Sequence, residues 1–75
     1  MLINKIIKIV GEVLVTEVNK NTSQKNCDKW DSLRHLDIIV ALEDAFDVTF
    51  EPEEIAEMKS LVIIDQMINA HLQSN

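Results

Sequence analysis

Ser32 and His35 are the two side chains whose types and spacing point most directly to chemistry. They lie three residues apart in the stretch DSLRHLDIIVALEDAFD, residues 31–47, and on a helix this spacing places them on one face. A hydrolytic serine also needs an orienting third group and an oxyanion hole, and no glycine-built hole accompanies this pair. We therefore predict no catalytic residue, and we expect Ser32 to be either a helix cap or a site of covalent modification.

Attachment of a phosphate-linked group is the modification that suits the position of Ser32. The N-terminus of a helix presents unpaired N–H groups and partial positive charge, so a phosphodiester on Ser32 would lie where the backbone favours an anion. The carboxylate of Asp31 opposes this slightly through like-charge repulsion.

The other histidine and the cysteine do not form a metal-binding pattern. His71 falls in the last turn of a predicted helix, where an imidazole complements the helix dipole. Cys27 is the single cysteine, which excludes an internal disulfide and a cysteine-based metal framework. We predict no metal site, and we interpret Cys27 as an ordinary loop thiol.

Hydropathy predicts no membrane span. The longest apolar run is Ile38–Leu42, far short of the roughly 20 residues that a spanning helix needs. Lys5, Lys8 and Glu12 interrupt the apolar N-terminal stretch, which argues against a signal peptide. We expect a cytoplasmic protein.

The two parts of the chain differ in charge. The formal net charge is −6, but residues 1–30 sum to +2 and residues 31–75 to −8. An acidic surface is a poor partner for nucleic acid, whose phosphates require a basic patch. It is a good partner for a basic protein surface.

Length and composition predict a single small helical domain over residues 1–75. Hydrophobic residues make up 47% of the chain and aromatic residues only 4%, with one Gly and one Pro, which favours aliphatic helix packing. We predict an all-α fold, a small four-helix bundle of three long helices and one short one, with a long loop between the first two. A chain of this size leaves little room for a deep enzymatic cleft, and nothing in it requires more than a monomer.

Apolar periodicity and helix-boundary residues place the elements. Apolar spacings of three and four predict a helix over about 3–17, and residues 19–30 form a loop whose Trp30 we expect to pack onto the core. The next helix covers about 32–46, with Asp31 or Ser32 as its N-cap. Pro52 begins the short third helix. Ser60 caps a last helix over about 61–72, and we assign its apolar contacts to Val62, Ile64, Met67, Ile68 and Leu72.

The predicted helix over 32–46 has two unlike faces. We assign one to the core, with Leu36, Ile39, Leu42 and Phe46 at its centre and Ile38 and Ala45 beside them. The opposite face mixes acidic and apolar side chains: Leu33, Asp37, Val40, Asp44 and Asp47, with Glu43 at its edge. Such a face is either a solvated helix side with two incidental apolar residues or a docking surface.

Several of these segments together resemble the acyl carrier protein family over nearly the whole chain. They are DSL at the start of the second helix, LDIIVALEDAFDV along it, F-x-P-E-E-I at the short helix and MKSL before the last. In that family the serine of Asp-Ser-Leu carries a 4'-phosphopantetheine arm derived from coenzyme A. The resemblance thus implies that Ser32 is the attachment point, with Asp31 and Leu33 completing the motif. It also implies that Leu33, Asp37, Val40, Glu43, Asp44 and Asp47 face partner enzymes.

The chain departs from the family pattern near this serine. The family often has glycine two residues before the aspartate, where this chain has Lys29, and Trp30 stands directly ahead of Asp31. The resulting WDSL is more like discrete carriers of specialised pathways. Arg34 stands where housekeeping carriers often have an acid, and His35 follows it, so partner choice is expected to differ.

The resemblance implies delivery rather than catalysis. The chain would hold an acyl or similar group as a thioester on the arm and pass it between enzymes, which replaces free diffusion by docking and local search. The implied partners are a phosphopantetheinyl transferase and acyl- or aminoacyl-activating and acyl-transferring enzymes with basic docking patches. A short acyl chain lying between the second and third helices is a further hypothesis. The alternatives are an aminoacyl or peptidyl carrier of a specialised pathway, and an unmodified acidic helical adaptor that docks a basic groove.

Overall fold

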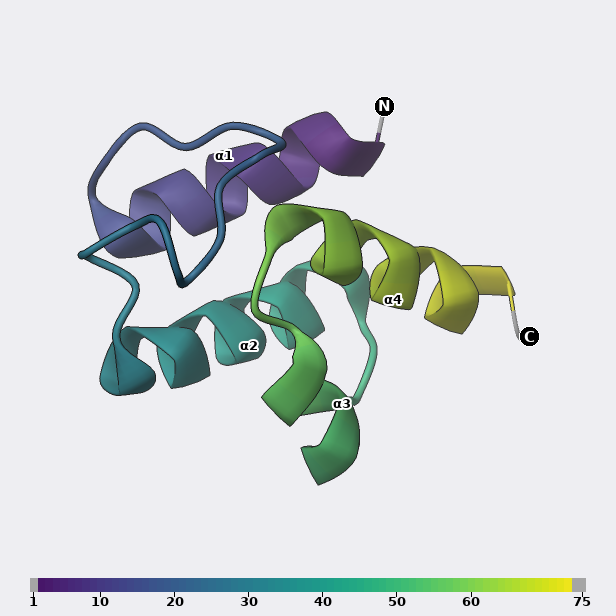
Figure 1. Cartoon of the computed structure of the whole chain (residues 1–75). Coiled ribbons are helices and arrows are strands. Elements are labelled where there is room, and N and C mark those ends of the chain that lie inside the picture. The colour runs from purple at the N-terminus through teal and green to yellow at the C-terminus, as the bar shows by residue number, and fades with distance from the viewer. Residues whose placement is uncertain (1, 74–75) are drawn as a thin grey trace.

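The computed structural model describes residues 2–73, which contain four helices and no strand. They are α1 (Leu2–Leu14), α2 (Ser32–Phe46), α3 (Pro52–Glu57) and α4 (Leu61–Gln73). The predicted helical class is confirmed. Helix α1 packs against both α2 and α4, and the short α3 lies on the opposite side of these two helices from α1 (Figure 1).

Helix α1 buries one stripe of side chains at intervals of four residues: Ile6, Val10 and Leu14. It ends three residues earlier than predicted. Val15 adopts a left-handed backbone conformation with φ of 54°, and the backbone N–H of Thr16 donates to the carbonyl of Gly11 at 3.2 Å. This closes the last turn in the manner of a C-cap, although Val15 lacks the glycine that usually signals one.

Residues 15–31 connect α1 to α2, running back over α1 before reaching the start of α2 (Figure 1). Backbone hydrogen bonds tie the middle of this loop to the segment between α3 and α4. The N–H of Gln24 donates to the carbonyl of Lys59 at 2.8 Å, and the N–H of Leu61 to that of Thr22 at 3.0 Å. At the end of the loop Trp30 is 2% exposed, which confirms that it packs onto the core.

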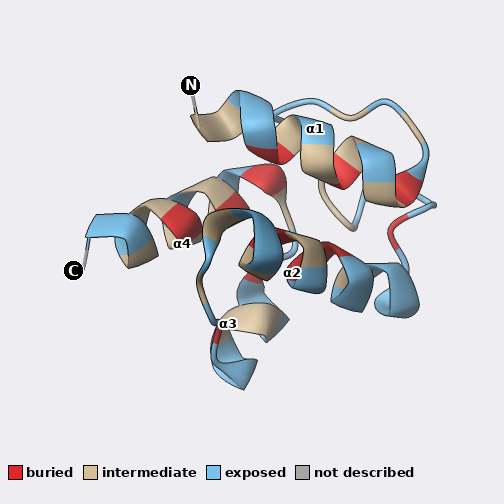
Figure 2. Ribbon diagram, turned by 180° about the vertical axis from the view of Figure 1, so that it is seen from behind, coloured by how far each residue is buried: buried red, intermediate tan, exposed pale blue. Residues whose placement is uncertain are grey.

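The buried core comes from α1, α2, α4 and three residues outside the helices, and in these three helices the buried positions lie on the inward faces (Figure 2). Burial of each aliphatic side chain contributes on the order of 1.5–3 kcal/mol. The buried residues are Ile6, Val10, Leu14, Trp30, Ile38, Ile39, Leu42, Phe50, Met58, Leu61, Ile64 and Ile68.

Ile38, Ile39 and Leu42 on α2 and Ile64 and Ile68 on α4 are buried as predicted, but the edges of the two inward faces differ from the prediction. His35 and His71 take half-buried positions, and Leu36 and Leu72, which follow them, are exposed. Assigning Leu36 to the core and Leu72 to the apolar contacts was therefore wrong, because in each helix a histidine occupies the position expected for a leucine. Ala45 and Val62 are exposed as well, so their assignments were also wrong.

The starts of α3 and α4 confirm their predicted boundary residues. Pro52 is the first residue of α3, and the N–H of Glu51 donates to the side chain of Glu54 at 2.8 Å. The hydroxyl of Ser60 accepts the N–H of Ile63 at 3.2 Å and so caps α4. None of the helices in residues 2–73 combines the length and apolarity needed to cross a membrane.

Candidate functional site

Asp31 caps helix α2, and Ser32 is its first helical residue. The carboxylate of Asp31 accepts the N–H of Arg34 at 2.8 Å, while the Asp31 carbonyl accepts the N–H of His35 at 2.9 Å. Of the two predicted caps, Asp31 is therefore correct and Ser32 is not. The Ser32 side chain is exposed, and its hydroxyl makes no hydrogen bond within residues 2–73. The fold thus leaves this hydroxyl available at the surface.

The surroundings of Ser32 carry both signs of charge. The guanidinium of Arg34 lies 3.9 Å from the carboxylate of Asp31, and it donates to the carbonyl of Lys29 at 3.4 Å. Arg34 and Asp31 are both exposed, so this pair contributes little stability. It does place a cation beside the carboxylate that would otherwise repel an anion at Ser32.

His35 does not pair with Ser32. Its Nδ1 accepts the indole N–H of Trp30 at 3.0 Å, and its Nε2 contacts the carbonyl of Ile55 at 2.8 Å. Both ring nitrogens are thereby engaged, and the ring stacks on Trp30 with centroids 6.0 Å apart. The i,i+3 spacing places the two residues near one another along the helix, but the histidine joins the loop to α3 and does not activate the serine.

The exposed face of α2 contains the predicted acidic and apolar residues. Leu33 is 76% exposed and Val40 64% exposed, and Asp37, Asp44 and Asp47 are exposed as well. Leu36, at 54% exposed, joins Leu33 and Val40 in an apolar stripe that the sequence did not predict. No sequence signal marks this position, because the tertiary contacts of His35 with Trp30 and Ile55 turn the histidine inward and Leu36 outward.

Glu43 differs from the other acids of α2. It is half-buried, and its carboxylate accepts the backbone N–H of Phe50 at 2.9 Å. It therefore ties the end of α2 to the segment that leads into α3. Asp47 also has a structural task, since it adopts a left-handed conformation with φ of 53° and ends α2.

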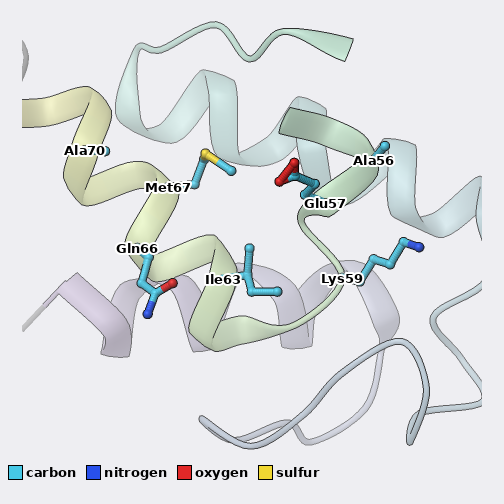
Figure 3. A pocket seen from close by; sticks show the side chains of 7 residues that line it. All are labelled: Ala56, Glu57, Lys59, Ile63, Gln66, Met67 and Ala70. Carbon is cyan, nitrogen blue, oxygen red and sulfur yellow. The ribbon is translucent and has the colours of Figure 1, made fainter. Parts of the chain in front are cut away.

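An open hollow of about 560 Å³ lies between α3 and α4 (Figure 3). Ile63 and Met67 project from α4 toward α3, and Glu57 and Lys59 supply charge of both signs at its edge. Ser32 is absent from its lining, which consists of Ala56, Glu57, Lys59, Ile63, Gln66, Met67 and Ala70. The hollow is thus separate from the serine site. Within residues 2–73, no three His, Cys, Asp or Glu side chains are grouped so as to hold a metal ion.

Comparison with known proteins adds no assignment to this geometry. No known protein family matches the chain, and no curated protein is significantly similar to it.

Proposed function

We propose that this protein is an acyl carrier protein whose Ser32 receives a 4'-phosphopantetheine arm from coenzyme A. The observation that carries the proposal is the Ser32 hydroxyl, which is exposed at the start of a 15-residue helix and makes no hydrogen bond with the described part of the chain. Asp31 performs the capping, so modification of Ser32 would disturb no hydrogen bond described in the structure. A transferase could approach the hydroxyl directly.

The first turn of α2 suits a phosphodiester on Ser32. The backbone N–H groups of Ser32 and Leu33 precede the first helical hydrogen bond, and the helix dipole places partial positive charge there. Arg34 offsets the charge of Asp31 beside the site. When bound, the arm would supply a terminal thiol that carries the acyl group as a thioester, and the protein would supply position and recognition.

The exposed face of α2 would dock partner enzymes. Its stripe of Leu33, Leu36 and Val40 provides apolar contact, and the acids around it would steer basic patches. Because the interacting charges lie at the surface, docking should weaken as ionic strength rises. The partners are a phosphopantetheinyl transferase and enzymes that load or remove the acyl group. We further propose that the protein is a cytoplasmic monomer and that its four helices form the bundle of an acyl carrier protein.

Two alternatives share the same surface. An aminoacyl or peptidyl carrier of a specialised pathway would use Ser32 in the same way and would differ in its cargo. Trp30 and Arg34, near the motif, do not decide between these cargoes. An unmodified adaptor would use the acidic face of α2 alone. The mass of the protein separates the adaptor from both carriers.

The test is incubation of the full chain with coenzyme A and a panel of phosphopantetheinyl transferases, read by intact mass. We expect one arm per chain, located at Ser32 by peptide mapping, and no addition to Ser32→Ala. Ser23→Ala is the matched control, because its backbone bridge to Ser60 does not require the hydroxyl. An unchanged mass with every transferase, for a chain that is folded by circular dichroism, would favour the adaptor. If the arm is present, mass analysis of the group released from it, with the protein isolated from cells, would identify the cargo.

A further inference from the structure

Both histidines of the chain contact the segment that contains α3, one from α2 and one from α4. The Nε2 of His35, on α2, lies 2.8 Å from the carbonyl of Ile55, and the Nε2 of His71, on α4, lies 2.8 Å from the carboxylate of Glu54. The ring of His71 also packs edge-on against Phe50, with centroids 5.1 Å apart. Helix α3 has no buried residue of its own. Its partly buried Ile55 packs against the core, and the two histidine contacts add to this packing in positioning α3.

The hydrogen bonds of His35 specify one protonation state. An indole N–H is only a donor, so the Nδ1 of His35 must accept from Trp30 and must carry no proton. A carbonyl is only an acceptor, so the Nε2 of His35 must carry the proton and donate to Ile55. The arrangement thus requires a neutral imidazole. A second proton, on Nδ1, would face the indole N–H of Trp30 across 3.0 Å.

We propose that His35 is a protonation-sensitive latch that holds α3 against Trp30 and the start of α2. Protonation replaces the Trp30 hydrogen bond by a contact between two donors, so the ring and the indole must separate. Trp30 is 2% exposed and packs in the core, whereas His35 is only half-buried. His35 is consequently the side chain that moves, and the Ile55 carbonyl loses the imidazole donor while it keeps the N–H of Met58 at 3.3 Å.

The charged groups near His35 provide no counter-ion for the protonated ring. On the preceding segment, the carboxylate of Asp31 accepts from Arg34, which is the cation closest in sequence on α2. On α3, the carboxylate of Glu54 is directed to Glu51 and His71. No carboxylate in residues 2–73 forms an ion pair with the His35 ring. Release into water is then the favourable route for the charged ring.

The contact of His71 responds to protonation in the opposite sense. A protonated His71 forms an ion pair with Glu54, which strengthens the attachment of α3 to α4. Phe50 and Met58, which flank α3, are buried and remain anchored. Acidification therefore weakens the contact of α3 with the start of α2 while the contact with α4 is retained, so that α3 shifts away from α2. The latch does not depend on whether Ser32 carries an arm.

The experiment uses the unmodified full chain labelled with ¹⁵N and titrated through about pH 8 to 5, the range in which histidines change charge. The chain has one tryptophan, so its indole N–H gives a single signal. We expect this proton to move upfield with the same midpoint as the ring signals of His35. Protection of the α3 amides, corrected for intrinsic exchange, should fall about tenfold over that range.

Three variants make the outcome decisive. His35→Gln keeps a donor and an acceptor but does not titrate, so the indole signal should no longer depend on pH. His71→Gln is the matched control; it should keep the indole titration and lose more α3 protection in acid. If His35→Gln fails to fold, Trp30→Phe removes the donor and should abolish the pH dependence of α3 protection that is due to His35. An indole signal that stays constant while the His35 ring titrates would overturn the latch, as would an unchanged α3 response in the variant lacking the donor.

Discussion

The carboxylate of Asp31 accepts the backbone N–H of Arg34 at 2.8 Å, and this bond caps α2 without using the neighbouring Ser32 hydroxyl. We expect Asp31→Ala to lower the free energy of unfolding by about 1 kcal/mol, the usual cost of a lost N-cap. Ser32→Ala should change it by much less, because the hydroxyl has no partner in the described structure. Urea denaturation of both variants measures the difference. Equal losses would contradict the division of tasks between the two residues.

Val15 should be replaceable with a gain in stability. It is 79% exposed and adopts φ of 54°, a conformation that a β-branched residue tolerates poorly. We expect Val15→Gly to raise the free energy of unfolding by about 0.5–1 kcal/mol. Val40→Gly is the control, since Val40 is also exposed but lies inside α2, where glycine should destabilise by roughly 0.5 kcal/mol. Thermal denaturation that shifts both variants in the same direction would refute this expectation.

Glu54 should make stability fall in acid. The N–H of Glu51 lowers the pKa of Glu54 below its ordinary value; partial burial opposes this shift, and His71 reinforces it. A carboxyl whose pKa is lower in the folded state stabilises the fold above its unfolded pKa, and this contribution is lost as pH falls through the folded pKa. The loss should therefore begin near 4.5, the unperturbed value, and continue below it.

Glu54→Gln isolates this effect, because the amide keeps an oxygen for the Glu51 N–H but does not titrate. We expect its stability to depend less steeply on pH between roughly 5 and 3 than that of the unchanged chain, measured by urea denaturation at each pH. Glu53→Gln, at an exposed neighbouring position, should retain the original slope. The same slope in Glu54→Gln and the unchanged chain would show that Glu54 is not responsible.

The apolar stripe of α2 should matter for partners and not for folding. If Ser32 is modified as proposed, Leu33→Ser and Val40→Ser should each lower kcat/KM for arm transfer by about five- to tenfold, as for central interface residues. Val62→Ser, at a half-exposed position on α4, should leave it unchanged. Transfer rates at increasing salt should also fall, because the acids beside the stripe act through screened surface charge. A matching loss in Val62→Ser would indicate a general effect on the protein instead.

The bounds of α2 were predictable from sequence because local residues set both of its ends. Asp31 caps the start, and Asp47 adopts the left-handed conformation that aspartate accepts more readily than most residues. The end of α1 was not predictable in this way. Val15 takes the same left-handed conformation without any glycine, asparagine or aspartate to mark it, and the bond from Thr16 to Gly11 is visible only in the folded chain.

The candidate site was predictable as far as single side chains are concerned. Ser32, Leu33 and Val40 are exposed as expected, because a helix with one apolar face fixes which residues point away. The position of Leu36 was not, since it depends on His35 finding partners in Trp30 and Ile55, the latter twenty residues along the chain. Periodicity treats a histidine as polar and outward, and only tertiary contacts reverse that assignment.

The bridge between Ser23 and Ser60 consists of two main-chain hydrogen bonds, from Gln24 to Lys59 and from Leu61 to Thr22. Side chains hold the adjoining turns, since the Thr22 hydroxyl accepts the N–H of Asn19 and the Asn26 amide oxygen accepts the N–H of Ser23. The bridge and the buried Trp30 together fix the number of residues between them. Extra residues should be tolerated beside the exposed Glu17, ahead of the Asn19 turn, and rejected between Gln24 and Lys29. Insertions, whether natural or engineered, should therefore be confined to the first of these two places in the connection.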